Sequence, residues 1–77
     1  MPLHRTKKGQ RIRIHSMPHG PLRAQFIRMG ISEGDSATCF ERLPGGTVVL
    51  QKNRQQIAIG RSLANEILIV IVDESKD

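Results

Sequence analysis

The chain has 77 residues, the size of one small domain with a limited core. It carries 12 Lys and Arg against 7 Asp and Glu, and the resulting net charge of +5 suits a nucleic acid, an acidic protein face or an anionic membrane surface. A single cysteine excludes an internal disulfide, and no stretch resembles a signal peptide or is long enough to span a bilayer, so we expect a cytoplasmic protein.

Aromatic residues are scarce, and this limits the ligand classes. Only Phe26 and Phe40 are present, with no Trp or Tyr. Single-stranded nucleic acid is usually held by stacking on aromatic side chains, and grooves for proline-rich peptides are lined with them. The sequence therefore disfavours both, although its charge keeps a small basic barrel that binds nucleic acid as an alternative function.

The N-terminal part of the chain predicts a turn followed by a strand. Residues 1–9 have turn character, and we expect the first half of them to fray, although Leu3 offers an anchor. Residues 10–16 alternate, with Ile12 and Ile14 on one side and polar residues on the other. This alternation predicts a half-buried strand.

A short helix is predicted between Gly20 and Gly30. Pro21 suits the first helical position, where its missing N–H would have no partner. The apolar face recurs at helical spacing in Leu22, Phe26 and Met29. Gly30 can adopt the left-handed cap that ends a helix, and Ile31 can then fold back onto Phe26. A helix this short needs a surface to pack on, so we expect it to cover one end of a barrel.

The rest of the chain predicts four more strands: 35–43, 47–51, 55–59 and 67–72. Ala37 and Cys39 are expected to face inward from the first of these, and the last, apolar on both sides, reads as a central strand or one lying under the helix. Residues 60–66 fit one helical turn with Leu63 and Ala64 facing in. The whole chain, 1–77, is expected to form one mainly β domain, a partly open barrel of about five strands, with residues 73–77 as a disordered tail.

Two blocks of sequence resemble the FeoA family. The first block comprises Met29, Gly30, Ile31 and Gly34. The second comprises Ile57, Ala58, Ile59, Gly60, Leu63, Ala64 and Ile67. The resemblance extends from Leu3 to Val72 and implies a small SH3-like β-barrel with one short α-helix inserted after the first strand. It also implies a non-catalytic accessory protein of bacterial ferrous iron uptake, acting on the cytosolic side of the FeoB membrane transporter, which has its own GTPase domain.

The same module is known as the C-terminal domain of iron-dependent repressors, which keeps a metal-responsive regulatory domain as a further alternative. No helix-turn-helix precedes the module in this sequence, which favours the free-standing transport form. The family pattern supplies no fixed metal or catalytic site. In partnership with the transporter, the protein would lie at the inner face of the membrane.

Catalytic motifs are missing from the sequence. There is no recognisable Ser/His/Asp set, no close acidic pair and no glycine loop of the P-loop type. We therefore expect no enzymatic activity, no cofactor and no direct GTP binding. Gly45 and Gly46 are better explained by a hairpin turn after Pro44.

The role of the family in iron uptake raises the question of metal ligands in this sequence. The candidates are His4, His15, His19 and Cys39, of which His15 and His19 flank Met17. Divalent iron prefers imidazole and carboxylate ligands, and no carboxylate lies near these histidines in sequence. Surface histidines and a buried cysteine are the default interpretation, so no metal site is predicted.

A docking surface is the favoured kind of site. On the helix, Arg23, Ile27 and Arg28 are expected to lie outward, as an apolar anchor with a basic rim. The alternative is that Ile27 packs on a neighbouring strand. The second candidate is a basic hairpin tip formed by Lys52, Asn53 and Arg54. Short barrels with exposed edges can also pair, so a homo-oligomer stays open.

Overall fold

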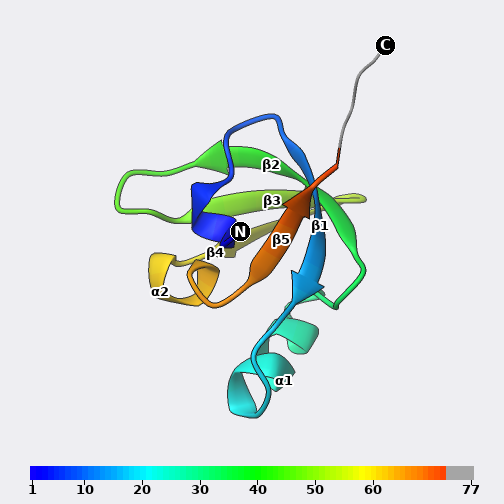
Figure 1. The fold of residues 1–77 in the computed structure, drawn as a ribbon. Helices are drawn as coiled ribbons and strands as arrows, with labels where there is room; N and C mark the ends of the chain where they lie inside the picture. The colour runs from blue at the N-terminus through cyan, green and yellow to red at the C-terminus, as the bar shows by residue number, and fades with distance from the viewer. Residues whose placement is uncertain (73–77) are drawn as a thin grey trace.

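The computed structural model describes residues 1–72, so the expected disordered tail at 73–77 lies outside the described residues. The elements in chain order are a 3₁₀ helix η1 (Leu3–Arg5), β1 (Arg11–Ser16), α1 (Pro21–Arg28), β2 (Ser36–Arg42), β3 (Val48–Lys52), β4 (Gln55–Ile59), α2 (Arg61–Ala64) and β5 (Leu68–Ile71) (Figure 1). The predicted mainly β class, with a helix inserted after the first strand, is confirmed.

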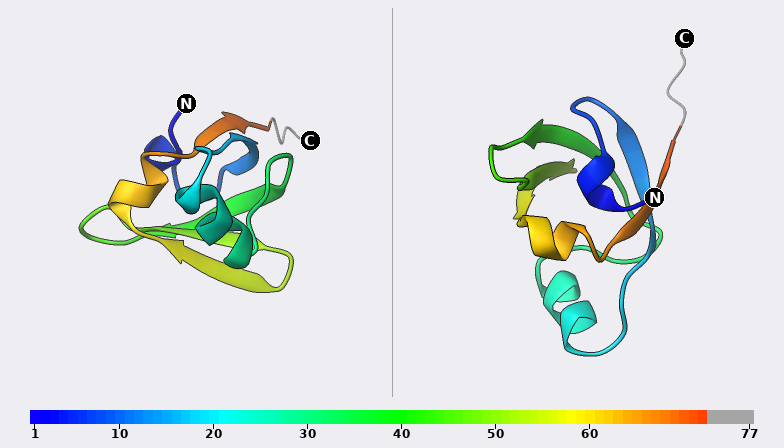
Figure 2. Two further views of the ribbon diagram at one scale, coloured as in Figure 1. Left: turned by 90° about the horizontal axis from the view of Figure 1, so that it is seen from below. Right: turned by 60° about the vertical axis from the view of Figure 1, so that its left-hand side comes forward.

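The strands form one antiparallel sheet in the order β4-β3-β2-β1-β5. The sheet curls, so that β1 and β5 lie on one side of the core and β3 and β4 on the other (Figure 2). Within residues 1–72 no ladder joins the edge strands β4 and β5. The result is a small, partly open barrel, as the pattern of short strands predicts.

The core follows from the alternation of apolar residues along the strands. In β1, Ile12 and Ile14 are buried, whereas their polar neighbours are exposed. Ile14 pairs with Ile69 of β5, and Cys39 of β2 pairs with Leu50 of β3. One buried cluster therefore unites all five strands, and the predicted inward orientation of Cys39 and of Ala37 is confirmed.

The helix α1 closes one end of this core (Figure 1). Phe26 is fully buried, while Leu22 and Met29 are half-buried against the same cluster. Gly30 ends the helix with φ of +97°. The N–H of Ile31 bonds the carbonyl of Phe26 at 3.0 Å, and that of Gly30 bonds Ile27 at 3.0 Å. These two bonds are the Schellman cap that the glycine predicts.

The position of β5 corrects one expectation. The strand was predicted to be central or under the helix because it is apolar on both sides, but it is an edge strand. Leu68 and Val70 point outward and are 43% and 44% exposed, whereas Ile69 is buried. The physical reason is that α1 covers the end of the barrel instead of the outer face of β5 (Figure 1).

The N-terminus supplies a second correction, since residues 1–3 are not frayed. The Met1 ammonium donates to the carbonyl of Ile69 at 2.9 Å, and the N–H of Ile69 donates back to Met1 at 2.7 Å. The N–H of Leu3 donates to Ile67 at 2.8 Å, and the Leu3 side chain is fully buried. The start of the chain therefore lies along the outer edge of β5.

The remaining turns fit their sequence with one adjustment. Lys52 belongs to β3 and pairs with Gln55, so the hairpin loop consists of Asn53 and Arg54 alone. Asn53 takes φ of +54°, the left-handed conformation that asparagine tolerates. The short α2 confirms the predicted helical turn, with Ala64 fully buried.

Candidate docking surface

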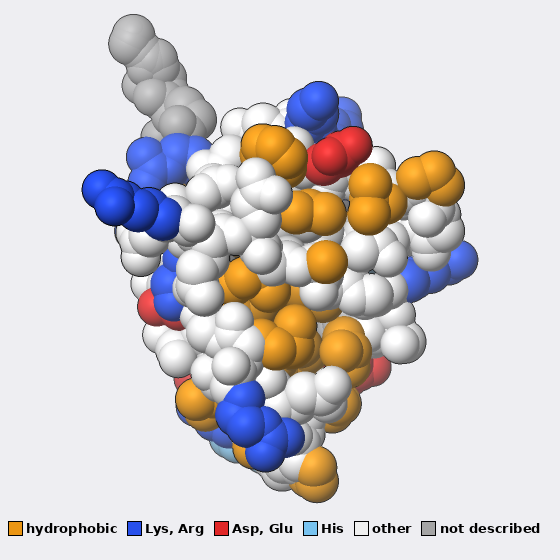
Figure 3. Space-filling model, turned by 180° about the vertical axis from the view of Figure 1, so that it is seen from behind, with side chains coloured by type: hydrophobic (Ala, Val, Ile, Leu, Met, Phe, Trp, Pro, Cys, Tyr) orange, Lys and Arg blue, Asp and Glu red, His pale blue; other side chains and the backbone are white. Residues whose placement is uncertain are grey.

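The outward face of α1 carries the first candidate surface. Ile27 is 49% exposed, so about half of this residue is accessible on the outer side of the helix. Arg28, next to it in the last turn, is also exposed. Seen from behind, a separate group of hydrophobic side chains gathers in the middle of the molecule, above the level of α1, which lies at the bottom in this view (Figures 1 and 3). An exposed apolar side chain beside a cation is the composition expected at the edge of an interface.

Arg23, on the same helix, has a partner within the chain. Its guanidinium Nη1 lies 2.9 Å from Glu33 Oε2, and the same carboxylate accepts the N–H of Met17 at 3.0 Å. These bonds stabilise the ionised carboxylate and lower the pKa of Glu33 to about 2. The pair connects α1 to the segment after β1 and to the turn before β2. Arg23 therefore positions the helix as well as lying on its surface.

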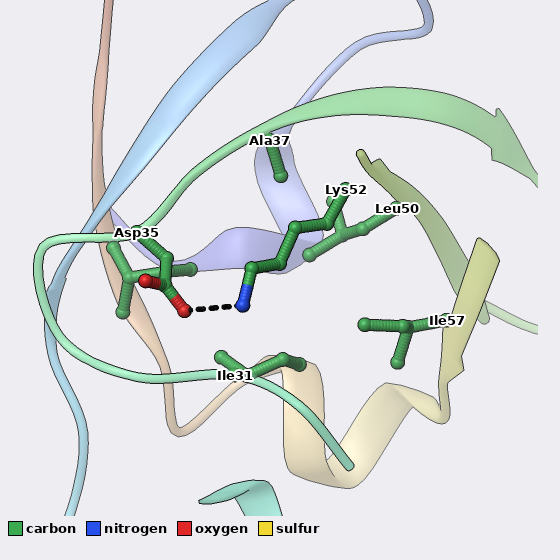
Figure 4. Close-up of a pocket in the computed structure, with 7 residues that line it drawn as sticks. Ile31, Asp35, Ala37, Leu50, Lys52 and Ile57 are labelled. Atoms are coloured by element: carbon green, nitrogen blue, oxygen red, sulfur yellow. Dashed lines mark hydrogen bonds and ion pairs between the residues drawn. The ribbon is translucent and has the colours of Figure 1, made fainter. Parts of the chain in front are cut away.

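Lys52 is turned toward the barrel instead of projecting from a loop. Its Nζ donates to Asp35 Oδ2 at 2.8 Å and to the carbonyl of Gly30 at 2.5 Å, and Asp35 Oδ2 also accepts the N–H of Ser32 at 2.7 Å (Figure 4). The hydrogen bond from Lys52 holds the pKa of Asp35 below its usual range. The close-up shows Ile31 and Ile57 near this lysine. Lys52 thus fastens the end of α1 to β3.

The two candidate surfaces lie next to each other because of these contacts. Gly30 sits against β4, since a Cβ built at Gly30 would lie 3.3 Å from Oε1 of Gln55. Asn53 and Arg54, which precede Gln55, are exposed. The structure therefore brings the last turn of α1 beside the β3–β4 hairpin. Sequence reasoning missed the roles of Lys52 and Arg23, because each ion pair joins residues ten or more positions apart.

The metal candidates do not come together. Cys39 is fully buried, and burial raises the pKa of its thiol. His15 lies on the opposite, outward face of β1, and His19 is exposed in the loop before α1. Residues 1–72 contain no group of three or more His, Cys, Asp or Glu side chains arranged to hold a metal ion. In the same part of the chain, no helix is long and apolar enough to cross a membrane.

A curled five-stranded antiparallel sheet with one helix after its first strand is a small barrel of the SH3-like class. The FeoA domain model matches residues 1–71, and the chain belongs to the FeoA family. No curated protein matches it by sequence.

Three solved structures share the fold. One is the crystal structure of an iron uptake regulatory protein, FeoA, which is 22% identical with a TM-score of 0.84, covering 94% of this chain and 97% of the other. The second, a FeoA-like protein from Clostridium acetobutylicum, is 19% identical with a TM-score of 0.84, covering 100% and 92%. The third, FeoA from Chlorobium tepidum, is 22% identical with a TM-score of 0.83, covering 99% and 74%.

Proposed function

We propose that this chain is a non-enzymatic accessory protein of ferrous iron uptake. In this proposal it docks on the cytosolic, GTPase-containing part of a FeoB-type membrane transporter and modulates the assembly or activity of that transporter. It works in the cytoplasm, at the inner face of the membrane, and leaves GTP binding to its partner. Membership of the FeoA family suggests the role in iron uptake.

The exposure of Ile27 is the observation that carries the docking proposal. A half-exposed isoleucine in the last turn of α1, with Arg28 beside it, can insert into an apolar pocket while the arginine meets an acidic rim. Arg54 extends the same cationic rim from the neighbouring hairpin. A partner with an apolar depression edged by carboxylates has the complementary chemistry.

Rigidity of the helix supports the same proposal. The Arg23–Glu33 ion pair holds α1 near its start, and Lys52 holds its end through Gly30. Phe26 anchors the helix between these two points by filling the core. A surface that is already in its bound conformation loses less conformational entropy on association, so α1 is suited to docking as a rigid unit.

Binding to the isolated cytosolic part of the transporter tests the proposal. Ile27→Asp combined with Arg28→Glu should abolish capture of that domain while the thermal midpoint of the variant stays near that of the wild type. Leu68→Asp combined with Arg13→Glu is the matched control, because Leu68 and Arg13 are an exposed leucine and an exposed arginine on β5 and β1. Undiminished binding by the α1 variant, or equal loss in both variants, would refute docking through α1.

A further inference from the structure

A hollow between η1 and α2 is not used by the proposed docking surface. It has a volume of about 480 Å³ and is lined by His4, Arg61, Ser62 and Asn65. The two short helices that supply these residues lie side by side (Figure 2). All four side chains are polar, none is a carboxylate, and Arg61 carries a positive charge, so the lining suits an anionic ligand.

Three of the four side chains that line this hollow, those of Arg61, Ser62 and Asn65, are exposed to solvent. Within residues 1–72, no hydrogen bond or ion pair involves the side chains of Arg61, Ser62 or Asn65. The Nδ1 atom of His4 is buried and unpaired as well. Buried polar atoms in proteins nearly always have a partner.

The arginine is held in place by its own stem. A Cβ built at Gly46, in the β2–β3 turn, would lie 2.9 Å from Cδ of Arg61 and 3.0 Å from its Cβ and Cγ. The aliphatic part of Arg61 therefore packs on the bare backbone of Gly46, which leaves the guanidinium at the hollow. A positioned guanidinium is the side chain best matched to the paired oxygens of an oxyanion.

From this set of donors we infer that the hollow binds a phosphomonoester through its phosphate group. The guanidinium of Arg61 supplies a positive charge and a rigid fork of N–H donors that can bind two phosphate oxygens at once. The Ser62 hydroxyl and the Asn65 amide supply neutral donors. The hollow is larger than a bare phosphate ion. The Ser62 and Asn65 side chains can also accept hydrogen bonds, which suits the hydroxyl-bearing remainder of a small phosphorylated metabolite.

A titration of the full chain, followed by ¹H–¹⁵N NMR, tests this inference. The probes are inorganic phosphate and glycerol 3-phosphate, with sodium chloride at matched ionic strength as the control. We expect both phosphates to give saturable shifts of the Ser62 and Asn65 amides, with glycerol 3-phosphate binding more tightly. Shifts that grow linearly, that chloride reproduces, or that spread evenly over all basic segments would overturn the site.

Variants separate the hollow from general surface charge. Arg61→Met keeps an unbranched stem on Gly46 and removes the fork, so it should weaken binding about tenfold or more, as loss of a charge-assisted hydrogen bond predicts. Arg13→Met removes an exposed arginine from β1, outside the hollow and outside the docking surface, and should leave affinity unchanged. Equal affinity in the wild type and in Arg61→Met would contradict the inference.

Two further changes keep the test decisive if Arg61→Met fails to fold. Ser62→Ala and His4→Gln each remove one group of the hollow, and each should weaken phosphate binding severalfold. Unchanged affinity in both would overturn the assignment. The measurement needs no transporter, and Ile27→Asp should not affect it, so failure of this site and failure of the docking proposal are distinguishable.

Discussion

Replacement of Gly30 by alanine probes the end of α1, on which both the barrel closure and the docking surface depend. Gly30 has φ of +97°, a conformation that residues with a Cβ adopt only under strain. Its new Cβ would also lie 3.3 Å from Oε1 of Gln55, closer than ordinary contact. We expect Gly30→Ala to lower the free energy of unfolding by about 1–3 kcal/mol, the cost of a strained backbone conformation.

Two other glycines serve as controls for this prediction. Gly34 has φ of +90° but nothing within 4 Å of a built Cβ, so Gly34→Ala measures the free-energy cost of backbone strain without a steric contact. Gly60 has φ of −63° and an equally open surrounding, so Gly60→Ala should stay within about 1 kcal/mol of the wild type. Urea unfolding at pH 7 measures the free energy of unfolding of all three variants. A domain of this size should lose roughly 4–8 °C in thermal midpoint for each kcal/mol.

The ranking of the three variants by stability tests the proposed role of Gly30. Gly30→Ala should be the least stable, Gly34→Ala intermediate and Gly60→Ala close to the wild type. A Gly30→Ala protein as stable as the Gly60→Ala protein would refute the Schellman cap as the feature that ends α1. Equal losses for Gly30 and Gly34 would show that the contact with Gln55 adds nothing.

Three further predictions follow from the buried and paired side chains. Phe26→Ala, at a fully buried position, should lower the unfolding free energy by about 3–5 kcal/mol in urea unfolding. Lys52→Met should cost about 1–2 kcal/mol, because two hydrogen bonds are lost and the carboxylate of Asp35 loses its cation. The pKa of Glu33 is lowered from 4.5 to about 2, so its stabilising effect is complete above pH 4.5 and disappears between pH 4.5 and 2. Thermal melts across that range should show a smaller acid-induced loss for Glu33→Gln than for the wild type.

Local patterns were sufficient to predict α1 and its cap. Pro21 at the start, Phe26 on the apolar side and Gly30 at the end are all signals carried by neighbouring residues. The same holds for the hairpin at Asn53, whose side chain tolerates the left-handed region. These features depend on the backbone conformation of a few neighbouring residues, and the conformational preferences of those residues can be read from the sequence.

Long-range pairing explains what sequence reasoning missed. The run of apolar residues in β5 reads as buried on both faces, yet Leu68 and Val70 are 43% and 44% exposed. The pairing of Met1 with Ile69 joins opposite ends of the sequence. In the sequence Lys52 appears as part of a basic loop, whereas in the fold it forms an ion pair with Asp35, which is 17 positions away. Periodicity describes one segment at a time, so it identifies strands but not which side chains they bring together.

Mapping the docking footprint on this chain is the most direct test of the proposed function. ¹H–¹⁵N NMR spectra recorded with the isolated cytosolic part of a FeoB-type transporter should show broadening or shifts at Ile27, Arg28, Asn53 and Arg54. Leu68 and Val70, which are exposed on β5, should stay unaffected. A footprint confined to β5, or a spectrum unchanged at saturating partner, would contradict docking through α1 and its neighbouring hairpin.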